Sequence, residues 1–375
     1  MFKLSRLLII LSSINLITSV ANAEEIYIPI LVPVTGFLSL EGTAQRNGAI
    51  QALDNAPTDL KIRYEVLDTA TSPEAAVTAL HRVLGRGTPT AIAAPIFGTQ
   101  MLAMLPIAKR AGVPLITVSG TAKLTELNNP FIFRFFPGDA VVKVAHARYI
   151  IDVLKSKRPA LLYQTTAYGQ SGQSHLSRIL KENGIPLVFE EALAPSVKDM
   201  LPALTKLKAS KPDVILLHLH STPTALVIRQ ARNLGIKLPI VAGSAMHQPS
   251  TAKLLNVAHL KGVCAESASS PISAKNPKII QFTNEFRKKF ATEPDAFALA
   301  QYDGMSMVIS ALRNGAKTAS DVQKWLAKNT FKGLAMTYKS DGKGNMAHDA
   351  LIVCYDGKSR VPQIIKQYSN IDGIL

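Results

Sequence analysis

Short apolar runs alternate with amphipathic segments along most of the chain, at nearly regular spacing. The first pairs are an apolar run at 26–32 with a helical pattern at 41–55, and a run at 62–68 with a helical pattern at 72–85. The helical segments carry apolar residues at three-to-four spacing, whereas the apolar runs are short, as parallel strands covered on both faces are. The pattern therefore predicts α/β units with parallel sheets.

A second series of the same kind follows, from the helical pattern at 139–155 to the apolar run at 239–244. The last part of the chain departs from the alternation, with three consecutive helical patterns and then a hairpin pattern, at 277–290, 297–314, 320–329 and 336–357. A helical block too large for one lobe, followed by strands that need a sheet to join, predicts that the chain crosses between lobes more than once. Lobes joined in this way form a hinge that closes on a ligand.

The expected fold class is α/β, with two doubly wound parallel-sheet lobes joined by a multi-strand hinge. We expect a first lobe formed by 24–140 with 266–335, and a second lobe formed by 141–265 with 336–375. The 47% hydrophobic composition of the 375-residue chain is sufficient for two domains of ordinary size.

The first 23 residues have the pattern of a secretory signal peptide. Lys3 and Arg6 precede an apolar stretch, which ends in Ala-Asn-Ala at 21–23, an A-x-A cleavage site. The apolar stretch is too short, and too often interrupted by Ser and Asn, for a membrane span. No lipid-attachment cysteine follows the cleavage site, so we expect a free periplasmic protein that starts at Glu24.

The formal net charge of the chain is +16, which becomes +14 once Lys3 and Arg6 are removed. The cations are dispersed, no arginine-rich tract occurs and there is one Trp, so we expect no nucleic-acid partner. A positive field could still raise the arrival rate of an anionic ligand. Cys264 and Cys354 are the only cysteines; export permits a disulfide, but the sequence leaves open whether they pair.

Hydroxyl, glycine and aromatic residues follow the predicted strands, at the edge where open parallel sheets bind ligands. Ser119, Gly120 and Thr121 follow the apolar run that begins at residue 114, and Thr99 begins the helical pattern 99–111. Helix N-termini present free N–H groups that favour an anion. We expect these residues to form a neutral cradle for a carboxylate, although each hydroxyl taken singly could be an ordinary helix cap.

Enzymatic and metal-binding motifs are not visible in these loops. The segment 165–172 is no G-x-S-x-G elbow, and neither a G-x-G-x-x-G fingerprint nor a P-loop occurs. His218 and His220 share one face of a strand, but the spacing suggests no third ligand for a metal. We expect no enzyme activity, no metal and no cofactor. His220 could reach the cleft, whereas His146 and His175 are expected at the surface or in packing contacts.

Five segments match, in order, the motifs of one protein family. They are IPILVPVTGFLSLEGTAQRNGAIQALD (28–54), GVPLITVSGTAKLTE (112–126), YQTTAYGQSGQ (163–173), ARNLGIKLPIVAG (231–243) and AQYDGMSMVISAL (300–312). Through them the chain resembles the type I periplasmic binding proteins, in particular the leucine/isoleucine/valine-binding branch of ABC-transporter substrate-binding proteins. The resemblance covers nearly the whole mature chain.

The resemblance implies a ligand held between the two lobes. Hydroxyls and backbone N–H groups of the first lobe would hold its carboxylate, at Thr99, Ser119, Gly120 and Thr121, and Tyr168 of the second lobe would close over it. The remaining expected contacts are an apolar lining and residues at the strand tips, namely Phe37, Leu38, Phe97, Ser244 and Met246.

One departure from the family pattern concerns the ammonium group of an amino-acid ligand. The family often places an acid two residues after the Gly that corresponds to Gly243, but here Ser244 and Ala245 follow. Either Asp303 supplies the negative charge, or the ligand has no ammonium; Asp303 could instead be a helix-surface residue or a hinge contact. Branched-chain or other amino acids and organic or aromatic acids therefore remain open as ligands.

The function that the resemblance implies is that of a monomeric receptor of an ABC importer. Its partners would be a small carboxylate solute and the membrane permease of the transporter. The sequence does not separate this role from that of a periplasmic sensor that reports ligand occupancy to a signalling partner. An exported hydrolase-like enzyme would need a base–nucleophile pair, and none is visible.

Overall fold

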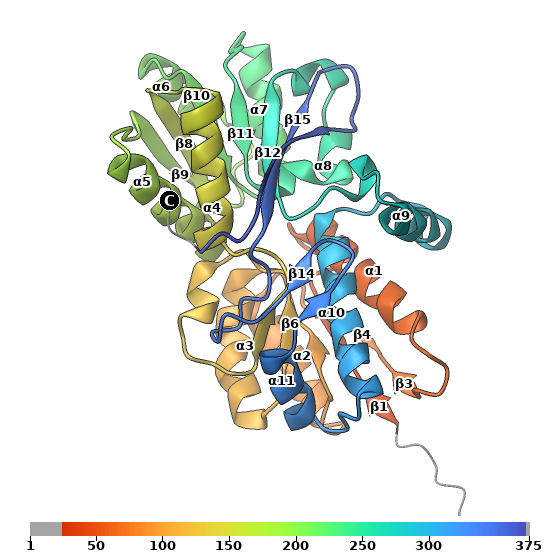
Figure 1. Cartoon of the computed structure of the whole chain (residues 1–375). Coiled ribbons are helices and arrows are strands. Elements are labelled where there is room, and N and C mark those ends of the chain that lie inside the picture. The colour runs from red at the N-terminus through yellow and green to blue at the C-terminus, as the bar shows by residue number, and fades with distance from the viewer. Residues whose placement is uncertain (1–24, 373–375) are drawn as a thin grey trace, which may run out of the picture.

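The computed structural model describes residues 25–372 and contains two α/β lobes. Figure 1 shows the first lobe at the bottom and the second at the top. The expected signal peptide lies outside the described residues. Within 25–372, none of the helices has both the length and the apolar character that a membrane crossing requires. The doubly wound two-lobe architecture predicted from the alternating pattern is confirmed.

The first lobe is built on a five-stranded parallel sheet in the order β4-β2-β5-β6-β7. Its strands are β2 (Ile30–Val32), β4 (Val66–Asp68), β5 (Ile92–Ala93), β6 (Leu115–Thr117) and β7 (Ile132–Arg134). A separate parallel pair joins β1 (Ile26–Tyr27) to β3 (Ile62–Arg63). Successive residues of β2 face opposite cores, because side chains alternate along a strand: Ile30 and Val32 belong to one hydrophobic cluster and Leu31 to another.

Helices cover both faces of the first sheet. One face carries α1 (Ser39–Asp54), α10 (Ala296–Arg313) and α11 (Ala319–Lys328), and the other carries α2 (Pro73–Leu84) and α3 (Gly98–Ala111). A further helix, α9 (Pro277–Phe290), packs its Phe282 and Phe286 against Ala298 and Leu299 of α10. The apolar stripes predicted for these segments are thus buried against a sheet or a neighbouring helix.

The second lobe contains a seven-stranded sheet in the order β16-β15-β12-β11-β10-β8-β9. Five strands are parallel, β8 (Pro159–Gln164), β9 (Phe189–Leu193), β10 (Val214–His218), β11 (Ile240–Ala242) and β12 (Val263–Ser267). The two at one edge, β15 (Ala350–Tyr355) and β16 (Gln363–Tyr368), are antiparallel. Helices cover both faces, α4 (Asp139–Arg148) and α5 (Ala167–Glu182) on one side, and α6 (Leu201–Ala209), α7 (Ser221–Asn233) and α8 (Pro249–Lys253) on the other.

Side-chain caps mark the start of several of these helices. The hydroxyl of Ser72 accepts from the Ala75 N–H before α2, and that of Thr166 accepts from the Gly169 N–H before α5. Thr318 and Asp321 form a capping box at α11. Helix α7 is one of those without such a cap, since the side chain of the preceding residue, His220, makes none. Its N-terminus is satisfied from outside its own lobe, as described below.

Within residues 25–372 the chain crosses between the lobes three times, after β7, after β12 and after β14 (Thr337–Tyr338). The last crossing comes later than the expected residue 336. Strand β14 pairs with β13 (Phe331–Lys332), and Tyr338, Met346 and Ala347 belong to a hydrophobic cluster of the first lobe. We therefore propose the lobe division expected from the sequence with three adjustments: 139–140, which begin α4, and 266–267, which end β12, are assigned to the second lobe, and 336–347 to the first.

A disulfide joins two strands of the second sheet that lie far apart in the sequence. Cys264 of β12 is directly opposite Cys354 of β15, and the two form a disulfide. The hydroxyl of Tyr149 lies 3.4 Å from the sulfur of Cys264 and 3.3 Å from that of Cys354. The disulfide therefore links β12, which precedes the second crossing, to β15, which follows the third. The sequence alone left this pairing open.

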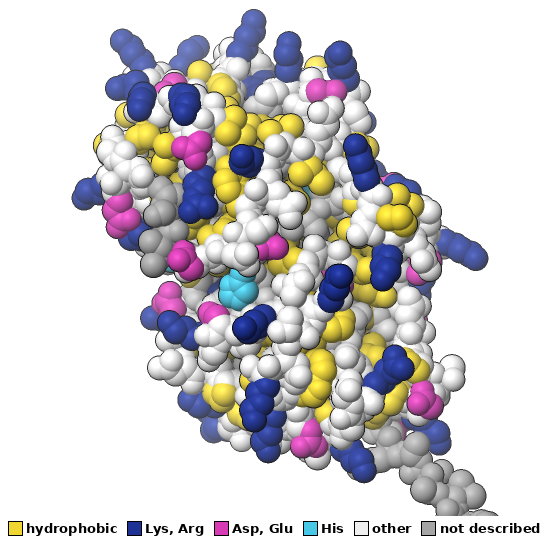
Figure 2. All heavy atoms as spheres, viewed as in Figure 1, with side chains coloured by type: hydrophobic (Ala, Val, Ile, Leu, Met, Phe, Trp, Pro, Cys, Tyr) yellow, Lys and Arg dark blue, Asp and Glu magenta, His cyan; other side chains and the backbone are white. Residues whose placement is uncertain are grey.

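Lys and Arg side chains are found on both lobes, and Figure 2 shows many of them, with few acids, at the outer end of the second lobe. Lys157 and Arg158 precede β8, Lys211 precedes β10 and Lys237 precedes β11, and all four side chains are exposed. They lie at the amino ends of parallel strands, opposite the carboxyl ends at which such sheets bind ligands. These four cations therefore lie on a surface remote from the cleft.

Candidate ligand-binding site

The carboxyl ends of the two parallel sheets face one another across a cavity of about 20 Å³. Both lobes line it: Glu41, Ile96, Gly120, Phe136, Pro137 and Phe297 on one side, and Asp139, Val142, Tyr168, His220, Ser244 and Ala245 on the other. This volume accommodates about one water molecule. The lobes are therefore closed on one another, and a larger solute needs the lobes or the Tyr168 ring to move.

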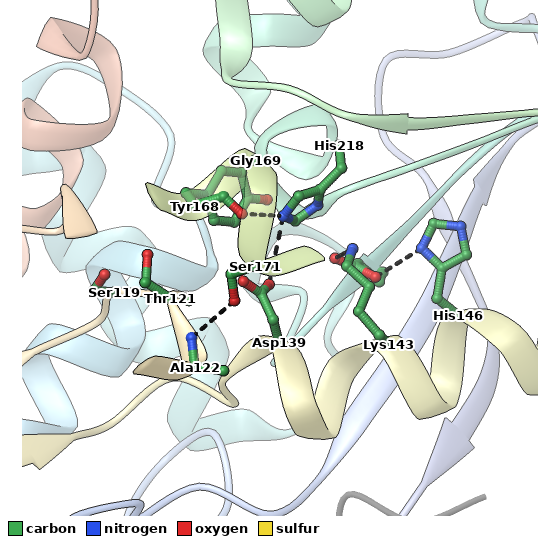
Figure 3. Close-up of polar contacts among 12 residues, drawn as sticks. Ser119, Thr121, Ala122, Asp139, Lys143, His146, Tyr168, Gly169, Ser171 and His218 are labelled. Carbon is green, nitrogen blue, oxygen red and sulfur yellow. Dashed lines mark hydrogen bonds and ion pairs between the residues drawn. The ribbon is translucent and has the colours of Figure 1, made fainter. Parts of the chain in front are cut away.

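A loop after β6 brings two hydroxyls to this region. Ser119 and Thr121 are buried, and their hydroxyl oxygens have no hydrogen-bond partner among residues 25–372 (Figure 3). A Cβ on Gly98, the first residue of α3, would lie 2.0 Å from Thr121 Oγ1, so glycine is required where the helix starts beside this hydroxyl. A buried polar group left unpaired costs about 1–3 kcal/mol. Two of them beside a helix N-terminus are suited to a ligand that accepts hydrogen bonds.

Arg134 holds the shape of this loop. Its buried guanidinium extends from β7, and Nη1 donates to the carbonyl oxygens of Thr121 at 2.6 Å and of Ser119 and Gly120 at 3.4 Å. Burial lowers the pKa of Arg134 to about 10, so the group stays charged at neutral pH. Sequence reasoning did not single out Arg134. The available signal was a lone cation inside the apolar run FIFRFF, at 131–136.

Glu41 of α1 lines the cavity from the first lobe and reaches the second. Its Oε1 accepts from the Ser221 N–H at 2.9 Å and from the Ser221 hydroxyl at 2.6 Å, at the first turn of α7. Its Oε2 is buried and has no partner among the described residues. Burial raises the pKa of Glu41 above its usual value. This role of Glu41 could not be predicted from the sequence, because the contact depends on how the lobes meet.

Asp139, the first residue of α4, is a second carboxylate of the cavity. Neither of its carboxylate oxygens makes a hydrogen bond within residues 25–372, although Oδ1 lies 3.6 Å from Nε2 of His218 (Figure 3). No Lys or Arg is among the residues that line the cavity. The sequence predicted only neutral groups around the ligand, but the structure also places the carboxylates of Glu41 and Asp139 in the cavity wall, near the loop 119–121, which we call the hydroxyl loop.

Aromatic rings from both lobes surround these polar groups. The Tyr168 ring of α5 lies 3.9 Å from the ring of His218 and 4.9 Å from that of His220, centre to centre. His220 also contacts Phe37 at 5.8 Å and Phe97 at 6.0 Å, both in the first lobe. Burial lowers the pKa of His220 to about 3, so its ring is neutral. The ring of His220 reaches the cavity, as the sequence allowed.

Beneath the cavity, α4 and β12 enclose a buried ionic network. Glu266 accepts from Lys143 Nζ at 2.5 Å, and its other oxygen lies 2.7 Å from His146 Nδ1 (Figure 3). Burial by itself raises the pKa of Glu266, but Lys143 and His146 lower it to about 2. The neutralised cluster supports the start of α4, where Asp139 lies. His146 is thus an interior polar residue, not a surface one.

The structure brings most of the sequence-predicted site residues together. Gly120, Tyr168 and Ser244 line the cavity, and Phe37 and Phe97 pack against one another at 5.5 Å and on His220. Ser119 and Thr121 flank Gly120 in the chain but are not themselves among the lining residues. Thr99 is partly buried in the first turn of α3 and is not among the lining residues. Leu38 is fully buried at the start of α1 and is not among them either.

Two predicted ligand contacts are corrected. Met246 is fully buried in the core of the second lobe, where its carbonyl accepts from the Tyr355 hydroxyl at 3.2 Å. Asp303 accepts from the backbone N–H groups of Leu334 and Ala335 at 2.8 Å, and also from the Tyr338 hydroxyl. Its carboxylate is needed to satisfy donors of the segment between β13 and β14, so it does not supply the charge missing after Gly243.

A family model described as periplasmic binding protein matches residues 25–359. An amino acid binding protein of Pseudomonas aeruginosa is 24% identical over 379 aligned residues, which cover 97% of this chain and 99% of that protein. The solved structure of the branched-chain amino acid substrate-binding protein LivJ from Streptococcus pneumoniae, in complex with isoleucine, has a TM-score of 0.83 and 24% identity, and covers 92% of this chain and 100% of that one. A solute-binding protein of R. palustris in complex with benzoate has a TM-score of 0.84 and 15% identity, covering 94% and 99%.

Proposed function

We propose that this protein, which belongs to the periplasmic binding protein family, is the solute receptor of an ABC importer and captures a small carboxylated solute between its lobes. The relatives and the solved structures that it resembles are binding proteins and not enzymes. A general solute-binding role therefore follows from the family. The chemistry of the solute and the importer context are our proposal.

The observation that carries the proposal is the pair of buried hydroxyls of Ser119 and Thr121, which have no hydrogen-bond partner in the described part of the chain. A carboxylate oxygen accepts hydrogen bonds and bears the negative charge that the N-terminus of α3 favours. Arg134 holds the loop in position and does not itself bind the solute, because its N–H groups donate to the carbonyl oxygen of Thr121 and to the side chains of Asn345 and Thr125. Tyr168, from the other lobe, is placed to cover the bound solute.

Export, monomeric state and partner belong to the same proposal. We propose that residues 1–23 direct the chain to the periplasm, where the closed protein docks as a monomer on the membrane permease of the importer. Closure hides the solute and changes the relative position of the two lobes, so a partner that contacts both lobes can distinguish the bound form from the free form.

A ligand screen tests the proposal. Thermal unfolding would be recorded with each amino acid and with a set of aliphatic and aromatic carboxylic acids at millimolar concentration. A ligand at one hundred times its dissociation constant stabilises the folded state by about 2.7 kcal/mol, which shifts the melting temperature by several degrees. The proposal is contradicted if no compound of either kind raises the melting temperature, or if hits bind equally well to a Ser119→Ala/Thr121→Val double variant.

A further inference from the structure

We propose that the solute carries a cationic nitrogen that binds Oε2 of Glu41, while Oε1 of the same carboxylate joins the lobes by capping α7. This inference rests on the proposed function, because it takes the cavity between the lobes as the solute site. It assigns one side chain to both recognition and closure.

The cap is the first part of the argument. Helix α7 begins without a cap from its own N-cap side chain, and two donors of Ser221, its first residue, are satisfied by Glu41 from the opposite lobe. A carboxylate at a helix N-terminus is favoured by the free N–H groups there and by the helix dipole. The cap forms only when α1 and α7 meet, so it is a contact of the closed protein.

The second oxygen of Glu41 is the next part. Oε2 is buried in the cavity wall without a hydrogen-bond partner, and both oxygens of Asp139 are in the same condition within residues 25–372. The charge of Arg134, behind the loop, acts on Asp139, but no Lys or Arg is among the described residues that line the cavity. A buried carboxylate oxygen without a donor, as Glu41 Oε2 is, is unfavourable. A cationic nitrogen between the two carboxylates would supply the missing donors and a positive charge beside Glu41.

The other groups that face Glu41 do not supply that cation. Nδ1 of His220, at the start of α7, lies 4.0 Å from Oε1, but burial keeps this ring neutral. Asp295, at the start of α10, adds negative charge, and its Oδ2 accepts from Gln248 Nε2 at 2.6 Å. Gln248 in turn contacts the Ser221 hydroxyl. The cross-lobe chain of hydrogen bonds is therefore acidic at both of its ends.

A consequence for specificity follows. A solute with a cationic nitrogen favours the ionised form of Glu41, and the ionised form is the better cap for α7, so binding and closure support one another. A carboxylate without such a nitrogen would enter a cavity that already holds two acidic groups. The substrate class is thus a carboxylated solute with an ammonium or guanidinium group, and Glu41 takes the place of the acid absent after Gly243.

Matched pairs of probes test this. Leucine and 4-methylpentanoate, phenylalanine and 3-phenylpropanoate, and lysine and hexanoate would be titrated by calorimetry into the wild-type chain, Glu41→Gln, Ser221→Ala and Glu182→Gln. Glu182 is an exposed acid of α5 and serves as the control. The wild type and Glu182→Gln should bind at least one nitrogen-containing member of a pair at least tenfold more tightly than its partner. Glu41→Gln should lose that preference, and Ser221→Ala should keep it.

The outcomes separate the two proposals. Equal or tighter binding of the des-amino partner by the wild type overturns the inference and leaves the proposed function standing. Retention of the preference in Glu41→Gln, with circular dichroism showing a folded chain, also overturns it. Absence of binding by every probe and every compound of the ligand screen overturns the proposed function, and this inference with it.

Discussion

Glu41 in the first lobe and Ser221 in the second are joined by two hydrogen bonds, from the Ser221 N–H at 2.9 Å and from its hydroxyl at 2.6 Å. A second cross-lobe contact runs from the Ala122 N–H to the hydroxyl of Ser171, at 2.9 Å (Figure 3). These bonds link polar groups across the cleft, whereas each lobe has hydrophobic clusters of its own. Closure is therefore held by few directional contacts and can reverse without unfolding either lobe.

Removing the cross-lobe hydroxyls should open the protein. Hydrogen bonds to charged groups contribute about 1.5–3 kcal/mol, and Ser221→Ala leaves its N–H to cap Glu41, so we expect about a tenfold loss of affinity for the best ligand. The double variant Ser171→Ala/Ser221→Ala should lose more. Small-angle scattering should give a larger radius of gyration for the double variant than for the wild type without ligand.

Ser210→Ala is the matched control for this prediction. Its hydroxyl donates to the Leu207 carbonyl at the end of α6, within the second lobe. This variant should scatter and bind as the wild type does. Equal radii for all three proteins would show that the serine contacts do not hold the lobes together.

Removing the hydroxyls of Ser119 and Thr121 should weaken ligand binding without lowering the stability of the fold. Ser119→Ala and Thr121→Val remove buried hydroxyls that have no partner within residues 25–372, so we expect unchanged or higher free energy of unfolding. Ligand affinity should fall, by about 1–3 kcal/mol for the pair. Calorimetric titration and urea denaturation of the same samples measure both quantities.

Thr117→Val is the contrasting variant in the same segment. Its hydroxyl donates to the Pro95 carbonyl at 2.8 Å and accepts from the Ser119 N–H at 3.1 Å, so its loss should reduce stability. If Ser119→Ala instead destabilises the chain as much as Thr117→Val does, the Ser119 hydroxyl is a structural group and not a ligand donor.

Arg134 should behave as a structural residue whose loss also abolishes binding. Arg134→Met leaves the carbonyls of Ser119, Gly120 and Thr121 without their buried donor, and we expect a loss of about 3–5 kcal/mol in the free energy of unfolding. Arg134→Lys should recover little, because an ammonium lacks the planar fork. By comparison, Arg178→Met removes an exposed pair with Glu182 and should change stability by less than about 1 kcal/mol. Equal urea midpoints for the Arg134 and Arg178 variants would contradict this view of the loop.

The alternation of strands and helices along the chain and the position of the hydroxyl loop, 119–121, were predictable because they follow from local patterns. An apolar run followed by hydroxyls and glycine places Ser119 and Thr121 at a strand tip whatever the rest of the chain does. Tyr168 was assigned to the cleft by resemblance, and its placement beside Gly120 agrees with that assignment. These features depend on residues close together in the sequence.

The acidic side of the cavity was not predictable in the same way. Glu41 lies in a helix whose pattern does not distinguish an exposed acid from one that caps a helix 180 residues later. For Asp303 the sequence leaves a ligand contact, a helix-surface position and a hinge contact open. Its actual partners, Leu334, Ala335 and Tyr338, come from a hairpin whose docking the sequence does not specify. In both cases the environment of a carboxylate is set by tertiary contacts between distant segments.

The buried acid at the start of α10 predicts a pH dependence with a definite sign. Burial raises the pKa of Asp295 from 3.8 to about 6. A carboxyl whose folded-state pKa is raised contributes stability that is present below the unfolded pKa and is lost as the pH rises through the folded pKa. The contribution of Asp295 to the free energy of unfolding should therefore decrease between pH 5 and pH 7.

Asp295→Asn isolates this contribution, since buried groups such as His220 and His247 titrate in both proteins. An asparagine can still accept from the Ala298 N–H that Asp295 Oδ1 caps, so the start of α10 is retained. Urea denaturation at pH 5, 6 and 7 should show the wild type losing about 1 kcal/mol more than Asp295→Asn between pH 5 and pH 7. Asp59→Asn, at an exposed site before β3, should follow the wild type. Parallel pH profiles for the wild type and Asp295→Asn would mean that Asp295 is ionised throughout this range, and that its bond to Gln248 is a charged contact across the lobes at every pH tested.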